Sequence, residues 1–220
     1  MHFKYRQIKK FILDLIFPVF CLSCNKEGQW LCENCLKKIE FKKPDAKREK
    51  GPGLDGLVVM ADYKNEIVKQ LIHLLKYNFA QDIRSALASL LAYYTKIYRV
   101  SFPAETLVIP VPLHKRRLRW RGFNQAQIIG EELAKIFCLN IRVDNLQRVR
   151  YTHPQVELSA AARKNNVKDA FFLLKPLEIS GKSVILIDDV YTTGSTMKEA
   201  TKVLKKAGAK EVTGFVIARG

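Results

Sequence analysis

The chain has 220 residues, of which 48% are hydrophobic, and a formal net charge of +17 at neutral pH. This length allows one or two domains with a buried core, and the composition excludes an intrinsically disordered chain. The positive charge favours polyanionic partners, namely nucleic acid, phosphorylated small molecules or acidic lipid headgroups. No apolar run is long enough to cross a bilayer, so we expect no transmembrane segment.

The N-terminal segment has a basic start and a short apolar stretch. Asp14 interrupts that stretch, Pro18 follows, and no small residues precede Cys21, as a secretory or lipoprotein signal would require. Apolar residues recur at helical spacing over residues 3–17. We therefore expect an amphipathic helix that packs on the protein, with binding to a membrane surface as the alternative. The expected location is the cytoplasm.

Four of the five cysteines form two C-x2-C pairs separated by seven residues. Two such pairs can direct four thiolates at one point, which predicts a structural zinc site with no open position for catalysis. The alternatives are two disulfides, which need an oxidising compartment, and a thioredoxin-like pair, which needs only one C-x-x-C. We expect metal binding to supply the folding energy of this small module. The expected ligands are Cys21, Cys24, Cys32 and Cys35. The fifth cysteine, Cys138, is expected to be a small buried hydrophobe on a helix face.

Composition divides the chain into three parts. Residues 1–41 hold the N-terminal helix and the cysteine module, residues 42–53 are a charged linker broken by Pro and Gly, and residues 54–220 form the main domain. In the main domain, apolar runs alternate with helical patterns, which predicts an α/β fold with a parallel sheet covered on both faces. We expect strands at 54–63, 106–113, 141–147, 170–174, 183–188 and 211–219, and helices at 65–78, 80–98, 124–137 and 195–207.

The most informative stretch is V-I-L-I-D-D-V-Y-T-T-G-S-T, residues 184–196. Ligands of parallel sheets lie beyond the carboxyl ends of the strands, where Asp188 and Asp189 follow the apolar run. Gly194 permits a positive φ, and backbone N–H groups at a helix start attract phosphate. Carboxylates beside a phosphate suit sugar hydroxyls, so the stretch predicts a ribose 5-phosphate site; the alternative is an ordinary strand–turn–helix with a capping threonine. The expected phosphate contacts are Thr192, Thr193, Gly194, Ser195 and Thr196.

This stretch resembles the phosphoribosyl diphosphate (PRPP) motif of type I phosphoribosyltransferases, and it lacks the Gly-Lys-Ser/Thr of a Walker loop. The stretches I-P-V-P-L-H-K-R-R-L-R-W-R-G-F-N-Q-A (109–126) and R-V-R-Y-T-H-P-Q-V-E-L-S-A-A-A-R-K-N-N-V-K-D-A-F (148–171) resemble signatures of the ComF family of competence proteins, as do the four cysteines. The resemblance spans essentially the whole chain. It implies a zinc ribbon before a Rossmann-like, type I phosphoribosyltransferase-like domain, and a role in DNA uptake during natural transformation. The partners it implies are PRPP or a related ribose 5-phosphate with Mg²⁺, single-stranded DNA, and a DNA-uptake helicase or other competence proteins.

The basic run H-K-R-R-L-R-W-R, residues 114–121, is predicted to be a loop. In related transferases the loop at this position receives pyrophosphate, and arginine forks suit phosphate oxygens. Trp120 among the arginines suits stacking on bases of a single strand. The alternative is a solvated basic loop in which Trp120 packs as an anchor. The expected pyrophosphate contacts are Lys115, Arg116 and Arg121, and the expected nucleic-acid contacts are Arg117, Arg119 and Trp120.

Residues 148–166 are polar and basic and lack periodicity. They fall where related transferases carry a mobile loop that closes over the diphosphate and excludes water. The resemblance implies Arg148, Gln155 and Arg163 as lid residues. Lys76, near the end of a predicted helix, is either a phosphate contact or a charge that complements the helix C-terminus.

Two activities from different classes fit these residues. As a phosphoribosyltransferase, the protein would stabilise the charge that grows on the leaving pyrophosphate, with Mg²⁺ bridging diphosphate and ribose and with Asp188 and Asp189 as catalytic carboxylates. As an accessory protein, it would bind single-stranded DNA and take PRPP as an effector. Net charge, the basic run and the cysteine module favour the second activity. A regulator that senses PRPP is a third hypothesis.

Overall fold

The computed structural model describes residues 18–44, 51–77, 80–150 and 168–220. Contacts divide the chain into two compact units, Met1–Ile39 and Glu40–Gly220. Among the described residues, no helix has both the length and the apolar character that crossing a bilayer requires. The helix expected over residues 3–17 and two expected lid residues, Gln155 and Arg163, lie outside the described residues.

The first unit brings its two cysteine pairs together by reversing the chain. Phe20 and Glu27 form an antiparallel β-bridge around the first pair, and Gly28 donates its backbone N–H to Val19 (2.8 Å). A short helix, α2 (Glu33–Leu36), carries the end of the second pair. The bridge brings the chain after the first cysteine pair back beside the residues that precede this pair, so the second pair lies next to the first. The buried side chains of residues 18–39 are Cys21, Leu31, Cys32, Cys35, Leu36 and Ile39.

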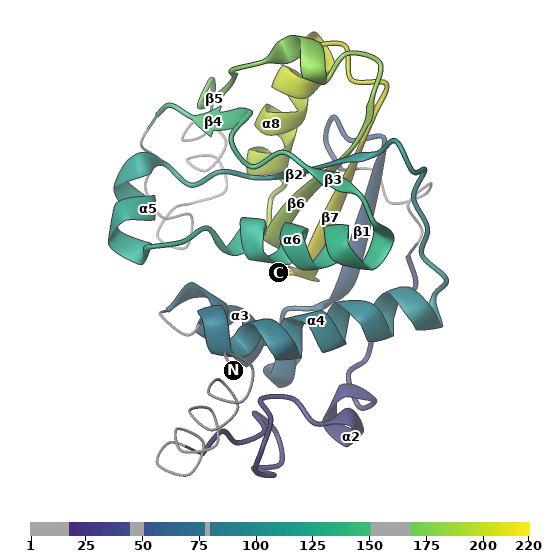
Figure 1. Ribbon diagram of the computed structural model, residues 1–220, viewed down its shortest axis with the longest axis vertical. Coiled ribbons are helices and arrows are strands. Elements are labelled where there is room, and N and C mark those ends of the chain that lie inside the picture. Colours follow the sequence, from purple (N-terminus) through teal and green to yellow (C-terminus); the bar gives the residue numbers. More distant parts are fainter. Residues whose placement is uncertain (1–17, 45–50, 78–79, 151–167) are drawn as a thin grey trace, which may run out of the picture. The chain divides into compact units, whose positions relative to one another are not determined.

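The second unit is built on a parallel sheet. Its strands are β1 (Gly56–Asp62), β2 (Leu107–Pro110), β3 (Asn140–Ile141), β6 (Ser183–Tyr191) and β7 (Glu211–Arg219). Their order is β1-β7-β6-β2-β3, and every neighbouring pair is parallel (Figure 1). The residues from Val184 to Ile187 are all buried, as expected for a strand covered on both faces. The predicted α/β fold with a parallel sheet is therefore confirmed.

Helices cover both faces of this sheet. The longer helices are α3 (Glu66–Lys76), α4 (Ala80–Ile97), α6 (Gln125–Phe137) and α8 (Ser195–Lys206). Leu186 of β6 belongs to an apolar cluster with Met197 of α8, whereas the next residue, Ile187, lies against Gly130 of α6. Successive strand residues point to opposite faces, so α8 and α6 cover opposite sides of the sheet (Figure 1). On the α6 side, α4 packs against α6 and α3 packs against α4.

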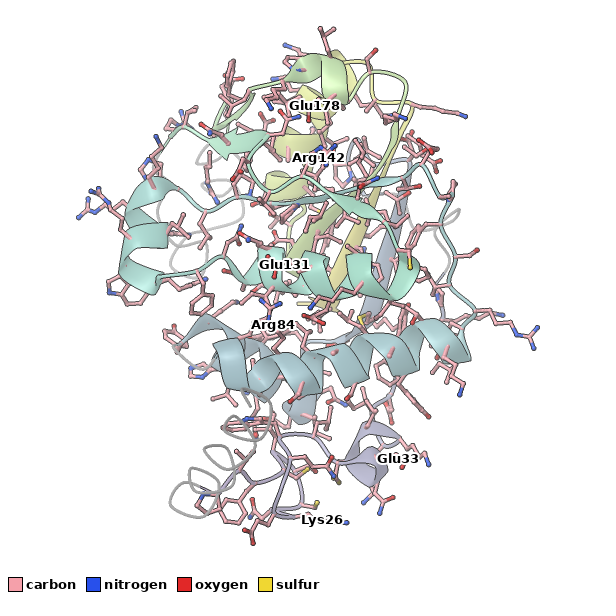
Figure 2. The ribbon with its side chains drawn as sticks, viewed as in Figure 1. Lys26, Glu33, Arg84, Glu131, Arg142 and Glu178 are labelled. Atoms are coloured by element: carbon pink, nitrogen blue, oxygen red, sulfur yellow. The ribbon has the colours of Figure 1, made fainter. Side chains whose placement is uncertain are left out.

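An ion-pair network joins α4 to α6. The Arg84 guanidinium of α4 lies 2.8 Å from a Glu131 oxygen and 2.9 Å from a Glu132 oxygen, both on α6 (Figure 2). Lys135, one turn further along α6, also contacts Glu132 (2.8 Å). Because Glu132 is buried, these two cations supply the opposite charge that a buried carboxylate requires.

Helix α6 lies close to the sheet at Gly130. A side chain at this position would meet Val108 and Ile141 at 3.3 Å, so glycine allows the close approach. At the start of α6, Asn124 accepts a backbone hydrogen bond as the predicted N-cap (3.1 Å). Its side-chain amide also donates to the Val111 carbonyl, directly after β2 (3.0 Å). These contacts fix the start of α6 relative to the carboxyl end of β2.

The single strand expected over residues 141–147 is two strands in different sheets. One is β3 of the parallel sheet; the other, β4 (Leu146–Arg148), pairs antiparallel with β5 (Phe171–Leu173). Just before β4, the Asn145 side chain accepts from the backbone N–H of Lys175 (2.8 Å) and donates to its carbonyl (3.0 Å). The prediction is wrong because polar residues divide the apolar pattern and one of them anchors the separate ribbon.

The basic run predicted to be a loop is a helix, α5 (Lys115–Arg121). His114 caps it by accepting a hydrogen bond from the backbone N–H of Arg116 (3.2 Å), and Gly122, with a φ of 80°, ends it. The run contains no proline or glycine, so it can form a helix once both ends are capped. None of its residues is buried. In Figure 1 the helix lies to one side of the strands of the sheet.

Cys138 is exposed, which contradicts the expected burial. Helix α6 ends at Phe137, and Cys138 is its C-cap with a φ of 53°. The left-handed conformation turns the chain away from the buried face of the helix. The prediction is wrong because the helix ends one residue before the cysteine.

Residues at both ends of the expected linker, 42–53, make contacts in the second unit. At its first residue, Lys42 donates its backbone N–H to the Met60 carbonyl of β1 (2.8 Å). Near its other end, a side chain at Gly51 would come within 2.9 Å of the Tyr191 hydroxyl. The described ends of this segment therefore pack as parts of the sheet unit.

Candidate functional site

The two adjacent acids lie inside a strand rather than after it. The sequence predicts the strand end at Asp188, but β6 pairs with β7 as far as Tyr191. Because side chains alternate along a strand, Asp188 shares a face with Leu186 and α8, whereas Asp189 shares the opposite face with Ile187 and α6. Asp189 is buried and Asp188 is half-buried. The two carboxylates therefore have different surroundings.

The partner of Asp189 is Lys76, the last residue of α3. The Lys76 Nζ atom lies 2.8 Å from Asp189 Oδ2, and the exposed fractions of the two side chains are 26% and 8%. The sequence indicated Lys76 as a phosphate contact or a helix-end charge, but it gave no signal for this pairing. Only the fold shows it, because α3 and β6 are far apart in the chain.

The pair makes the two acids electrostatically unequal. Burial, together with the charge of Asp189, raises the pKa of Asp188 well above its ordinary value. Burial also acts to raise the pKa of Asp189, but the Lys76 ammonium outweighs burial and lowers it. Burial acts to lower the pKa of Lys76, and the Asp189 carboxylate reverses this and raises it. Asp189 and Lys76 thus form an ion pair, and Asp188 is the acid that takes a proton more easily.

A backbone turn follows the acids and leads into α8. Gly194 has a φ of 72°, and α8 begins at the next residue, Ser195. The hydroxyls of Thr193 and Ser195 lie 2.8 Å apart. A side chain at position 194 would collide with the Tyr191 ring, including Cζ at 2.6 Å. The turn therefore requires glycine, and it directs backbone N–H groups and hydroxyls to the helix start, where an anion binds favourably. Thr192 and Thr196, the remaining residues that the sequence predicts as phosphate contacts, flank this turn in the chain.

Two arginines add positive charge near the acids. Arg121, at the end of α5, donates from Nη1 to Gln125 Oε1 (2.6 Å), while its buried Nε has no hydrogen-bond partner among the described residues. Burial lowers its pKa, and the charge of Asp189 opposes this. Arg148, the first residue of the segment that the sequence assigned to a lid, is buried in β4, with its guanidinium over the Phe171 ring at 5.5 Å. Burial, with the charge of Arg117, lowers its pKa to about 10, and Asp188 opposes this.

The other expected contacts lie on α5. Trp120 is 73% exposed, so the alternative in which it packs as an anchor is wrong. Burial, together with the charges of four arginines that include Arg148, lowers the pKa of His114 at the start of the helix. The helix therefore presents a strongly positive surface with one exposed aromatic ring. Its remaining basic residues are Lys115, Arg116, Arg117 and Arg119.

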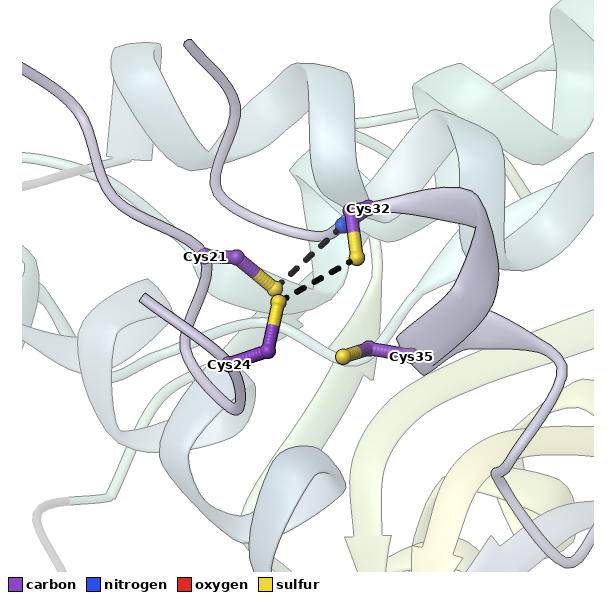
Figure 3. A group of neighbouring side chains, drawn as sticks. All are labelled: Cys21, Cys24, Cys32 and Cys35. Carbon is purple, nitrogen blue, oxygen red and sulfur yellow. Dashed lines mark hydrogen bonds between the residues drawn. The ribbon is translucent and has the colours of Figure 1, made fainter. Parts of the chain in front are cut away.

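The four paired cysteines form a compact cluster (Figure 3). Their sulfur atoms lie within 4.8 Å of one another, and those of Cys24 and Cys32 are 3.5 Å apart. A tetrahedral zinc ion with Zn–S bonds of about 2.3 Å separates its sulfurs by about 3.8 Å. All four cysteines are free thiols. The cluster therefore fits a tetrahedral metal ion with four thiolate ligands.

The thiols differ in how easily they ionise. Burial acts to raise the pKa of Cys21, but hydrogen bonds from the backbone of Cys24, Cys32 and Ser23 lower it to about 6. A hydrogen bond with Ser23 acts to lower the pKa of Cys35, but burial and the other thiols raise it to about 12. A bound metal cation would favour the thiolate form of all four, since thiolates are the ligands that zinc binds.

The chain matches a known domain family over part of its length. Residues 124–220 match the phosphoribosyl transferase domain. This range begins at the N-cap of α6 and contains β6, the turn at Gly194 and α8. The sheet unit is therefore a phosphoribosyltransferase-type domain.

Similarity to known bacterial proteins extends further. The chain is 33% identical to competence protein F of Haemophilus influenzae over 211 residues, which are 92% of this chain and 85% of that protein. It is 32% identical to the DNA utilization protein YhgH of Escherichia coli over 203 residues, 90% of this chain and 88% of that protein. It is 27% identical to competence protein ComFC of Streptococcus pneumoniae over 210 residues, 90% of this chain and 87% of that protein.

Proposed function

This chain belongs to the ComF family of competence proteins, and from that membership we propose that it binds PRPP, or a related ribose 5-phosphate, together with Mg²⁺ at the carboxyl edge of its sheet. We further propose that it acts in DNA uptake by handling single-stranded DNA. Relatives named competence protein and DNA utilization protein support this role.

The observation that carries the ligand proposal is that Asp188 lies near the carboxyl end of β6 and that the turn at Gly194 directly follows this strand. A half-buried carboxylate accepts hydrogen bonds from sugar hydroxyls, and the turn supplies backbone N–H groups and hydroxyls for a terminal phosphate. The Nε atom of Arg121, which has no hydrogen-bond partner in the described part of the chain, adds support, because a buried guanidinium N–H lacking an acceptor costs free energy that a phosphate oxygen would offset.

The donor set also fits Mg²⁺. This ion prefers one or two carboxylates together with substrate phosphates, and it keeps several waters. Asp188 can contact such an ion or its waters because it is only half-buried. When bound, Mg²⁺ would neutralise charge on the diphosphate. The residues of the chain would orient the ligand: Asp188 at the hydroxyls, the turn at the terminal phosphate and Arg121 at the diphosphate.

Helix α5 supports the proposal for single-stranded DNA. A surface of lysine and arginine side chains attracts the phosphate backbone, and an exposed ring such as Trp120 can stack on a base without sequence preference. The cysteine cluster, for which we propose structural zinc, would fold the first unit rather than react. We retain the proposal that residues 1–41 form this module and that 42–53 connect it to the domain at 54–220.

Calorimetry with PRPP and Mg²⁺ tests the ligand proposal. The wild-type protein should bind, and the double variant Asp188→Asn/Asp189→Asn should lose binding because both carboxylates are removed without a change of size. Asp169→Asn, an exposed acid outside the site, is the control and should bind normally. Binding that survives the double change would contradict the proposal. Release of pyrophosphate with a candidate acceptor would favour the alternative of an active transferase, and a PRPP-dependent change of shape would favour a PRPP sensor.

Salt-dependent binding to a short single-stranded oligonucleotide tests the second proposal. The affinity should fall with salt at a slope of about −0.7 per phosphate neutralised, and Arg117→Gln/Arg119→Gln should make that slope shallower. Trp120→Ala should weaken binding at every salt concentration, because stacking does not depend on charge. Leu177→Ala, at a side chain that is 90% exposed, is the matched control. Equal binding by all variants would place the DNA elsewhere.

A further inference from the structure

We propose that Lys76 is a positioning residue of the ligand site. Its ion pair holds Asp189 on the α3 side of the sheet and leaves Asp188 as the carboxylate that meets the sugar hydroxyls. This inference rests on the proposed binding of PRPP and gives the two adjacent acids separate roles.

Lys76 and Asp189 form a short ion pair that is largely shielded from solvent. Lys76 Nζ and Asp189 Oδ2 are 2.8 Å apart, and both side chains are largely removed from solvent. Lys76 directly follows Leu75, which is fully buried, as are Leu71 and Ile72 one turn earlier. The apolar packing of α3 therefore fixes the position of the Lys76 ammonium. Because little of this side chain is exposed, water competes weakly with the Asp189 carboxylate for it.

The strand separates the two acids. Asp188 and Asp189 are neighbours in β6 and point to opposite faces of the sheet. The backbone N–H of Asp189 also donates to Asp188 Oδ1 (2.9 Å), which restricts the Asp188 side chain. With Asp189 bound to Lys76, Asp188 is the carboxylate with oxygens left for a ligand.

Charge gives the pair a role beyond packing. A buried carboxylate that loses its cation remains an uncompensated negative charge. Here that charge would lie close to the place where we propose that a diphosphate binds, and in a partly buried site its repulsion is weakly screened. Lys76 therefore favours the anionic ligand by neutralising Asp189, without touching the ligand.

The experiment measures PRPP binding with Mg²⁺ by calorimetry for Lys76→Met, Lys76→Arg, Asp189→Asn and the double variant Lys76→Met/Asp189→Asn. The control is Lys69→Met, on the same helix, whose exposed pair with Glu66 (3.4 Å) lies outside the site. Thermal unfolding of each full-length variant is recorded in parallel, so that binding is compared only among folded proteins.

Lys76→Met should weaken binding by about tenfold or more, and Lys76→Arg should stay within about threefold of wild type because the charge is kept. The double variant should bind more tightly than Lys76→Met, since it removes the uncompensated carboxylate together with its partner. A purely structural role would not give this recovery, because the double variant lacks the contact as well.

The other possible results distinguish a failure of the positioning role from a failure of the proposed function. If the wild type binds PRPP and Lys76→Met binds equally well, the positioning role is wrong and the proposed function stands. The role is also wrong if the double variant loses as much as the two single variants together. If wild-type protein binds no PRPP, the proposed function fails, and the inference fails with it.

Discussion

The described part of the first unit and the sheet unit bury different kinds of side chain. In residues 18–39, half of the buried side chains are cysteines of one cluster, and the rest are three aliphatic residues. In the sheet unit, strands such as β6 are buried on both faces and pack between α6 and α8. A handful of aliphatic residues cannot offset the conformational entropy of folding, whereas a sheet covered on both sides can. From this comparison we expect that the described part of the first unit needs the proposed metal ion to stay folded, whereas apolar burial stabilises the sheet unit.

Removal of the proposed metal ion should give the largest effect, and this effect should be confined to the first unit. Cys32→Ser, or a strong chelator, should raise amide hydrogen exchange across residues 18–39 to the level of an unfolded chain, since structural zinc contributes about 10–16 kcal/mol in small modules. Exchange in β6 and β7 should not change. Cys138→Ser, at an exposed thiol outside the cluster, is the control. Protection of residues 18–39 without metal would show that the aliphatic residues suffice.

A cavity in the sheet unit should give the next largest effect. Leu186→Ala removes a fully buried side chain between β6 and α8, and should lower the free energy of unfolding by about 2–5 kcal/mol. Urea unfolding of the full chain measures it. Leu177→Ala, at an exposed leucine, should change it by about 0.5 kcal/mol or less. Equal effects of the two changes would contradict the role of apolar burial.

The extra cost in stability of a methyl group at the turn, relative to one at an unobstructed glycine, should be smaller than the cost of that cavity. Gly194 and Gly181 share a φ of 72°, but a side chain at Gly181 would meet nothing within 4 Å, whereas one at Gly194 would meet Tyr191. Gly181→Ala should cost about 1–2 kcal/mol through backbone strain alone. Gly194→Ala should cost about 1–3 kcal/mol more through overpacking, and should also weaken PRPP binding. Thermal unfolding and calorimetry measure the difference; equal costs would mean that Tyr191 moves aside freely.

The ion pairs of the sheet unit should contribute least. Arg84→Met leaves the buried Glu132 with Lys135 as its one remaining ion-pair partner among the described residues, and should cost about 1–2 kcal/mol in urea unfolding. Lys182→Met breaks an exposed pair with Glu105 and should cost about 0.5 kcal/mol or less. A loss at Arg84 as large as that of Leu186→Ala would mean that charge, and not only apolar burial, sustains this unit.

Local pattern was enough to predict most of the fold. The apolar runs of β1, β6 and β7 and the amphipathic helices α3, α6 and α8 each carry their own periodicity, so the sequence predicts them within a few residues. Helix α5 was missed because its cap is a histidine, a weaker signal than serine or aspartate, and because its charges suggested a solvated loop. The β4–β5 ribbon was missed as a separate sheet because pairing across a long stretch leaves no local trace.

The site was predicted only in part for the same reason. The turn at Gly194 and the adjacent acids form one continuous motif, so its chemistry can be inferred from the residues alone. The separation of Asp188 from Asp189 follows from how far β6 extends, and their different pKa values depend on Lys76, which another helix provides. Tertiary contacts of this kind cannot be inferred from spacing along the chain.

The close approach of α6 to the sheet at Gly130 limits where the start of this helix, and the Arg121 side chain that it contacts, can lie. The first residue of α6, Gln125, holds the Arg121 guanidinium, and the N-cap Asn124 holds the end of β2. A bulkier residue at position 130 would displace the helix by a few tenths of an ångström, because Val108 and Ile141 leave no free space. Gly130, which has no side chain and lies well inside the helix, thus helps to determine the distance between Arg121 and the two aspartates. A substitution there would change this distance without changing any side chain of the proposed site.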